Sequence, residues 1–129
     1  NKAKSKTIPT GNYFFLQMGY PYQRKENAMF YNVLKAKDIV DYKKLSLDIE
    51  ELMQDGESSL SVVALQKHEQ MDTYTSKQNT AIYVIEGEVE LHLDAEKFAI
   101  DKEEILMFKK EKEYKILAKK DSKFMVIKI

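Results

Sequence analysis

Two histidines are the only imidazoles in the chain, and each has two interpretations. His68 lies in the polar stretch 67–70 beside Glu69, which indicates either a solvated loop histidine or an acid–base group oriented by that carboxylate. His92 occupies a polar position of an alternating pattern, so we expect it to face away from the core, exposed or at a subunit contact. Two histidines cannot form a histidine-rich metal site.

Other reactive residue types narrow the chemistry further. The chain has no cysteine, which excludes disulfides, thiolate zinc sites, iron–sulfur clusters and cysteine nucleophiles. No serine lies in a glycine-flanked nucleophile elbow, and the four glycines form no phosphate-binding loop. Carboxylates lie mostly in mixed charge runs, such as 101–104, that are typical of solvated turns.

The bulk composition predicts one folded domain and excludes two classes of partner. The chain has 129 residues, of which 43% are hydrophobic and 33% charged. Its 21 basic and 21 acidic side chains cancel, so we expect no nucleic acid and no anionic membrane as a partner. No apolar run is long enough to span a bilayer, and residues 1–10 are polar and basic. We therefore expect a cytoplasmic protein.

Strand patterns dominate the chain from residue 59 onward. Short apolar or alternating runs, separated by charged turns, recur about every ten residues; they span 60–65, 81–85, 89–93, 98–100, 105–108, 114–117 and 124–129. Such spacing, with almost no helix, predicts an all-β antiparallel sandwich or barrel.

The stretch before residue 59 is less uniform. Residues 48–54 fit either a strand or a helix, and the following Asp55-Gly56 turn signal favours a strand. Asp38 could cap a brief helix over residues 39–45.

The first 28 residues are expected to form an N-terminal arm before a single domain at 29–129. Residues 1–10 resemble a mobile tail, whereas residues 13–22 carry aromatic side chains, a leucine and a methionine. So apolar a segment should dock, either over the core of its own domain or against the sheet of a second subunit.

Three segments resemble motifs of the cupin superfamily. The run AIYVIEGEVEL at 81–91 is similar to the first cupin motif, KFAIDKEEILMF at 97–108 to the start of the second, and KFMVIKI at 123–129 to the closing strand. The resemblance covers 57–129 well and 29–56 loosely. It implies a cupin-type double-stranded β-helix, a jelly-roll barrel with an N-terminal extension, and a homodimer.

The resemblance also implies where cupin metal ligands would lie. Counting from Gly87, the two motif-one histidines fall on Tyr74 and Ser76, the glutamate on Thr80, and the motif-two histidine on Tyr114. Hydroxyl groups that stay protonated near neutral pH do not replace imidazole and carboxylate as ligands. We therefore expect no bound transition metal and no cofactor.

In cupins, alternate residues of each strand face the barrel interior, and the resemblance therefore implies which residues line the barrel here. The expected ligand-binding residues face inward from both sheets: they are Tyr74, Ser76, Thr80, Ile82, Val84, Tyr114 and Ile116. Phenols, hydroxyls and aliphatic walls suit a small neutral organic ligand. Alternatively, the tyrosines fill the space that a metal and substrate would occupy.

Several functions remain open from the sequence. The first is a non-metal cupin-like module that binds a small molecule or regulates through its dimer surface. The second is a metal-independent isomerase or epimerase, with Tyr74 or Tyr114 as acid and His68 or Glu69 as base. A third is an interaction protein that uses residues 13–22 as its contact surface. A metal-dependent cupin enzyme with unusual ligands is disfavoured, and the sequence names no substrate.

Overall fold

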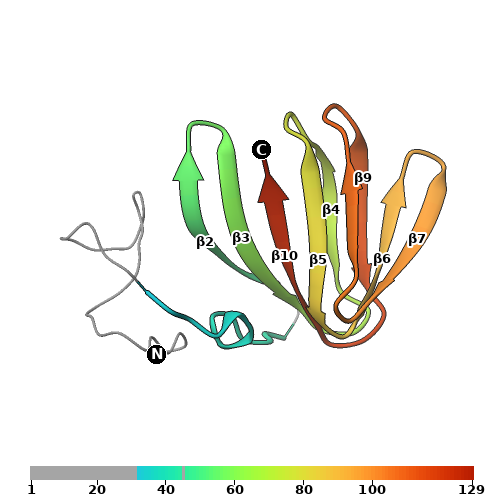
Figure 1. Cartoon of the computed structure of the whole chain (residues 1–129). Helices are drawn as coiled ribbons and strands as arrows, with labels where there is room; N and C mark the ends of the chain where they lie inside the picture. Colours follow the sequence, from blue (N-terminus) through green and yellow to red (C-terminus); the bar gives the residue numbers. More distant parts are fainter. Residues whose placement is uncertain (1–31, 45) are drawn as a thin grey trace.

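The computed structural model describes residues 32–44 and 46–129 (Figure 1). The predicted arm 1–28, with its apolar segment 13–22, lies outside the described residues. Within them, nine strands form two antiparallel sheets, and the single short helix is the 3₁₀ turn η1 (Ala36–Asp38). This confirms the all-β fold class predicted from the strand pattern.

The first sheet has five strands in the order β2-β3-β10-β5-β8. Their bounds are β2 (Asp48–Asp55), β3 (Ser58–Leu65), β10 (Ser122–Lys128), β5 (Thr80–Glu86) and β8 (Ile105–Phe108). The second sheet has the order β4-β9-β6-β7. Its strands are β4 (Gln70–Thr75), β9 (Glu113–Ala118), β6 (Glu88–Leu93) and β7 (Glu96–Asp101).

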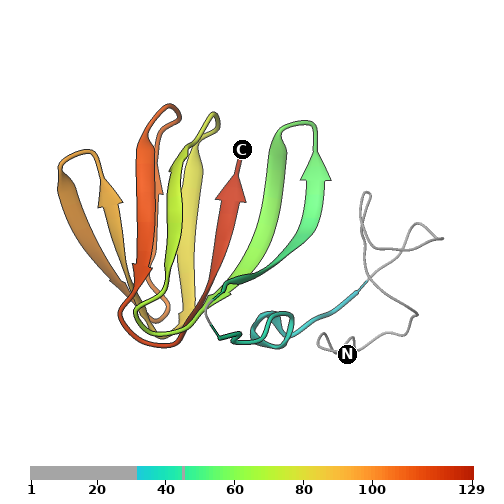
Figure 2. The same cartoon turned by 180° about the vertical axis from the view of Figure 1, so that it is seen from behind.

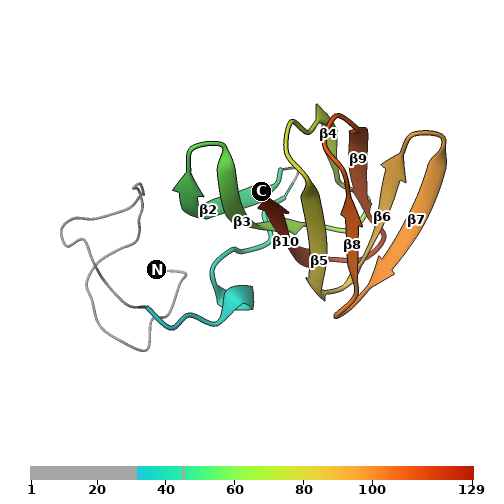
Figure 3. The ribbon, with the colours of Figure 1, turned by 45° about the horizontal axis from the view of Figure 1, so that its top comes forward.

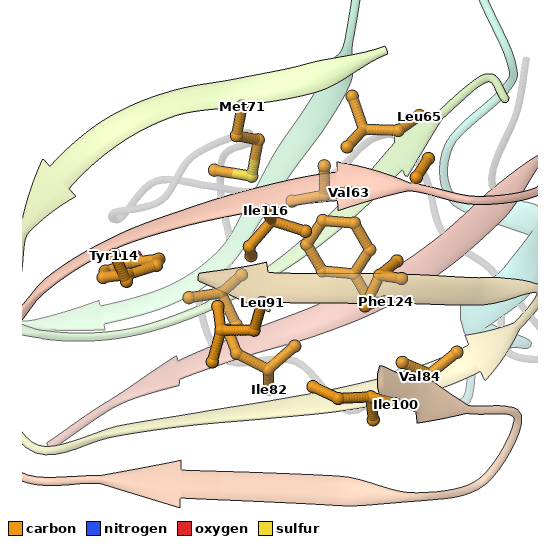
Figure 4. Close-up of a cluster of buried hydrophobic side chains, with 13 residues drawn as sticks. Val63, Leu65, Met71, Ile82, Val84, Leu91, Ile100, Tyr114, Ile116 and Phe124 are labelled. Atoms are coloured by element: carbon orange, nitrogen blue, oxygen red, sulfur yellow. The ribbon is translucent and has the colours of Figure 1, made fainter. Parts of the chain in front are cut away.

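The two sheets pack face to face, and their inner faces make one core. Figure 3 shows the second sheet lying to one side of β10, β5 and β8. Alternate residues of each strand point inward, as the period of two residues in a β-strand requires. In β5, for example, the buried residues are Thr80, Ile82 and Val84. Both sheets contribute to the packed cluster in Figure 4, which includes Ile116 and Phe124.

A second, smaller cluster covers part of the outer face of the first sheet. Ile39 and Val40 pack on Val62 and Ala64 of β3, so this strand is buried on both faces. That coverage explains why residues 62–65 are continuously apolar rather than alternating. The brief helix predicted over residues 39–45 is wrong, because the helical turn lies earlier, at η1, and Ile39 and Val40 pack directly on the sheet.

Two glycines make the turns that the sequence indicated. Gly56 (φ +63°) closes the β2–β3 hairpin and confirms residues 48–54 as a strand. Gly87 (φ +89°) turns the chain between β5 and β6, and Ser122 closes this corner by accepting a hydrogen bond from the Glu88 amide at 2.9 Å. In Figure 2, the strands are seen to draw together at one end of the molecule and apart at the other.

Candidate functional site at the barrel mouth

Tyr74 and Tyr114 form a cross-strand pair where β4 ends and β9 begins. They are partners in the β4–β9 register, so their side chains project from the same face of the sheet, and their ring centroids lie 6.0 Å apart. Tyr114 belongs to the core cluster, so this shared face is the inner one. Tyr74 is nevertheless 43% exposed, which places it at the rim of the barrel rather than within the core.

The Tyr114 phenol is buried, and its hydroxyl has no hydrogen-bonding partner among residues 32–44 and 46–129. Only 2% of the residue is exposed, and its aromatic neighbours are the rings of Tyr74 and Phe108. Burial, with a smaller contribution from Tyr74, raises the pKa of Tyr114 to about 12. The group is therefore a neutral phenol at physiological pH. Buried polar groups are almost always paired, which marks this hydroxyl as unusual.

Ser76 and Thr80 form a second polar pair on the same side of the barrel. Their hydroxyl oxygens lie 2.6 Å apart, and both hydroxyls are within hydrogen-bonding distance of the Gln78 carbonyl, at 2.6 Å from Ser76 and 3.0 Å from Thr80. Both residues are buried. These hydroxyls satisfy each other and the connecting loop, so they differ from the unpaired phenol of Tyr114.

A row across the first sheet connects the two pairs. The strand registers align Ser59 of β3, Lys128 of β10, Thr80 of β5 and Phe108 of β8. The Phe108 ring lies 5.1 Å from the Tyr114 ring, which joins this row to the opposite sheet. Tyr74, Ser76, Thr80, Phe108, Tyr114 and Lys128 are together called the barrel mouth below. The end of β10 marked C in Figure 1 lies here.

The predicted aliphatic lining lies deeper in the barrel. Ile82, Val84 and Ile116 are fully buried and belong to the core cluster. Figure 4 shows Tyr114 at one end of that cluster, with Ile82 and Ile116 between it and Val84. These three residues therefore form packed floor beneath the barrel mouth rather than an open wall.

The barrel mouth does not suit the metal that cupin motifs imply. The four positions counted from Gly87 hold hydroxyl groups, of which Ser76 and Thr80 are engaged with each other and the Tyr114 phenol holds its proton. Divalent first-row metals prefer imidazole or carboxylate ligands. In the described part of the chain, no cluster of three or more His, Asp or Glu side chains could hold an ion.

The structure separates the predicted base residues from the tyrosines. His68 and Glu69 precede β4, where the His68 and Ala118 backbones are hydrogen-bonded, whereas Tyr74 lies near the other end of β4. At roughly 3.3 Å per residue, five residues of strand separate the Cα atoms of Glu69 and Tyr74 by up to ~17 Å. The pairing of His68 or Glu69 as base with Tyr74 or Tyr114 stays a prediction, and this separation along β4 disfavours it.

His92 behaves as the strand pattern predicted. It is partly exposed on the outer face of β6, and its Nε2 lies 2.9 Å from a carboxylate oxygen of Glu90. This contact is the main cause of a lowered pKa for the Glu90 carboxyl. The pair lies on the face of the second sheet that points away from the core, so it takes no part in the barrel mouth.

Sequence reasoning missed Lys128 and Phe108 of the barrel mouth. Lys128 shares the phase of Phe124 and Val126 in β10, and this alternation was the signal that could have placed its side chain on the inner face. No hydrogen bond or ion pair engages its ammonium group within the described ranges. Phe108 was seen only as a strand end, although its register with Thr80 brings it to the same place.

Comparison with proteins of known structure identifies the fold. No protein-family profile matches the sequence, and no curated protein matches it. Solved structures do match: a cupin superfamily protein from Desulfitobacterium hafniense has a TM-score of 0.70 and 18% identity, over 84% of this chain and 98% of that one. The chain has the cupin fold.

Two further structures share this cupin fold along almost their whole length. A conserved protein of unknown function from Streptococcus pyogenes has a TM-score of 0.69 and 15% identity, over 83% of this chain and 95% of that one. An RmlC-like cupin from Desulfovibrio desulfuricans has a TM-score of 0.63 and 14% identity, over 82% and 95%. Identities this low establish the fold alone.

No helix in the described residues has the length and apolarity to cross a membrane.

Proposed function

We propose that this chain is a cupin-fold module that binds a small organic ligand at the barrel mouth without a transition metal. The observation that carries the proposal is the Tyr114 hydroxyl, which is buried beside a half-exposed aromatic ring and has no hydrogen-bond partner in the described residues. An unpaired buried hydroxyl costs about 1–3 kcal/mol, and a ligand that hydrogen-bonds to it recovers part of that cost.

The chemistry of the barrel mouth restricts the ligand. The rings of Tyr74 and Phe108 flank Tyr114 and favour a flat, largely apolar body. The Tyr114 phenol can donate or accept one hydrogen bond. The sequence predicted a neutral ligand, but Lys128 adds a cation to the same row. We therefore expect the ligand to present an acceptor, such as a carboxylate, toward Lys128.

Catalysis is the weaker alternative for this site. A metal-independent isomerase or epimerase needs a base close to the phenols, and His68 and Glu69 lie at the other end of β4. In addition, the raised pKa of Tyr114 makes its phenol a poor acid catalyst near neutral pH. Binding or regulation requires neither a general base nor a general acid, and therefore fits the barrel mouth better.

A ligand titration followed by backbone amide shifts tests the proposal. Matched pairs of a small aromatic acid and its alcohol, such as benzoate and benzyl alcohol, serve as probes. Binding at the barrel mouth shifts the amides of Tyr74, Thr80 and Tyr114, and Tyr114→Ala abolishes these shifts. Tyr83→Phe is the matched control, because Tyr83 projects from the outer face of β5.

Each outcome of this titration has a defined meaning. Shifts at the barrel mouth that persist in Tyr83→Phe and vanish in Tyr114→Ala support the proposal. A panel of such pairs that leaves all three amides unmoved contradicts it, and indicates that the tyrosines only fill the barrel. A stoichiometric transition metal retained by the purified protein also contradicts it.

A further inference from the structure

The outer face of the first sheet carries a continuous apolar row. The strand registers align one outward-facing residue from each of the five strands: Met53 of β2, Leu60 of β3, Ile127 of β10, Ala81 of β5 and Met107 of β8. A neighbouring row adds Tyr83 and Ile105. These residues are called the outer apolar row below.

The outer apolar row is exposed where a sheet ordinarily carries polar residues. Met107 is 73% exposed, Met53 66% and Ile105 50%. Antiparallel sheets that meet water on one face usually alternate apolar and polar side chains. Contiguous apolar patches on a soluble domain mark a contact surface.

The second sheet of the same chain provides an internal comparison. Its central outward row is polar, since His92 is aligned with Lys97 on one side and Lys115 on the other. In the next row, Glu90 lies between Ala99 and Leu117. The row of the first sheet, apolar on all five strands, therefore has no counterpart in these two rows of the second sheet, and it needs its own explanation.

The chain already covers the adjacent part of this face with its own residues. Ile39 and Val40 pack on Val62 of β3, and Leu34 and Met125 extend the same cluster. The described chain begins at Asn32, two residues before Leu34. The described chain therefore begins close to the cluster that borders the outer apolar row.

Residues 13–22, which lie outside the described range, match this surface in composition and reach. Their sequence is YFFLQMGYPY, and no residue in it is charged. The intervening residues 23–31 span up to ~30 Å when extended, at roughly 3.3 Å each. A five-stranded sheet is ~19 Å across, from four spacings of about 4.8 Å. The extended linker is therefore longer than the sheet is wide.

We propose that residues 13–22 pack on the outer apolar row of their own chain. The segment continues the coverage that Leu34, Ile39 and Val40 begin, and it removes two apolar surfaces from water at once. The methionine side chains of the row suit an irregular aromatic segment, because sulfur makes favourable contacts with aromatic rings.

Methionine methyl NMR on the full chain tests the proposal directly. Met53 and Met107 report on the row, and Met71, buried in the core, reports on the fold. Contact with residues 13–22 gives Met53 and Met107 upfield ring-current shifts and cross-peaks to aromatic protons. Phe14→Ser with Phe15→Ser removes both effects and leaves the Met71 methyl unchanged.

A mixed sample separates the possible occupants. One half carries labelled methionine methyls and the other half labelled aromatic rings, so cross-peaks between them arise only between two chains. Their absence, with cross-peaks present in a uniformly labelled sample, supports packing within one chain. Intermolecular cross-peaks overturn the proposal and indicate that a second copy covers the row. Met53 and Met107 methyls that are unaffected by the double substitution also overturn it, and indicate that residues 13–22 do not cover the row.

Discussion

Tyr74 and Tyr114 face each other across the β4–β9 register, yet only Tyr114 is withdrawn from solvent. Their ring centroids are 6.0 Å apart, while Tyr74 is 43% exposed and Tyr114 2%. The boundary between solvent and core thus runs between two paired residues. The pair therefore combines an accessible aromatic surface on Tyr74 with a buried polar group on Tyr114.

Removing the Tyr114 hydroxyl should weaken ligand binding without lowering the stability of the fold. Tyr114→Phe deletes a buried group without a partner among the described residues, so we expect the free energy of unfolding to stay equal or rise by up to about 1 kcal/mol. Ligand affinity at the barrel mouth should fall about tenfold, which corresponds to one neutral hydrogen bond. Urea unfolding and amide-shift titration measure the two quantities. A loss of stability well above 1 kcal/mol would mean that the hydroxyl is paired.

The same phenol predicts a pH dependence at the alkaline end. The folded pKa of Tyr114 is about 12, above the usual value of about 10. Because the folded state favours the protonated phenol, this contribution to stability is full below about pH 10 and is lost as the pH rises toward about 12. Urea unfolding of the wild-type protein and Tyr114→Phe from about pH 8 to about pH 11 measures it.

The comparison between those two proteins isolates Tyr114. Other tyrosines and lysines titrate in both and cancel in the difference. The stability of the wild type should fall relative to that of Tyr114→Phe above about pH 10. Parallel curves over the whole range would show that the folded pKa of Tyr114 is not raised.

Much of the fold was predictable because the strand pattern has period two. In β6, Val89 and Leu91 alternate with polar residues, and their burial confirms the inner face predicted for them. β4 was harder to recognise, because Met71 is its only buried residue and a bulge follows it. A rim strand with little burial leaves a weak hydrophobic pattern.

The barrel mouth was predictable in part. Counting from one turn glycine brought Tyr74 and Tyr114 into register, but it did not reveal that one ring is exposed. His68 could not be placed, because its distance from Tyr74 depends on which end of β4 each occupies. Lys128 was within reach of the same parity argument, since it follows Phe124 and Val126 at intervals of two.

Restoring cupin-type ligands should create a metal site. Tyr74→His, Ser76→His, Thr80→Glu and Tyr114→His together place three imidazoles and a carboxylate at positions that the structure gathers at the barrel mouth. The quadruple variant should bind zinc or nickel with at least about 100-fold higher affinity than the wild type. Calorimetric titration measures the affinity, and replacing Thr80→Glu by Thr80→Gln in the same background is the control. A folded variant without metal binding would show that the count from Gly87 assigned wrong positions.

Gly87, from which that count starts, should tolerate no side chain. A Cβ at this position would meet Ser122 Oγ and the Asp121 carbonyl oxygen, and its φ of +89° is a conformation that L-residues rarely adopt. Gly87→Ala should therefore lower the free energy of unfolding by about 2–4 kcal/mol, from backbone strain and overpacking together. Gly56→Ala is the matched control, because Gly56 also has a positive φ (+63°) but no atom within 4 Å of the added Cβ. It should cost about 1 kcal/mol. Equal losses in urea unfolding would show that φ alone, and not the contact with Ser122, sets the requirement for glycine at the β5–β6 turn.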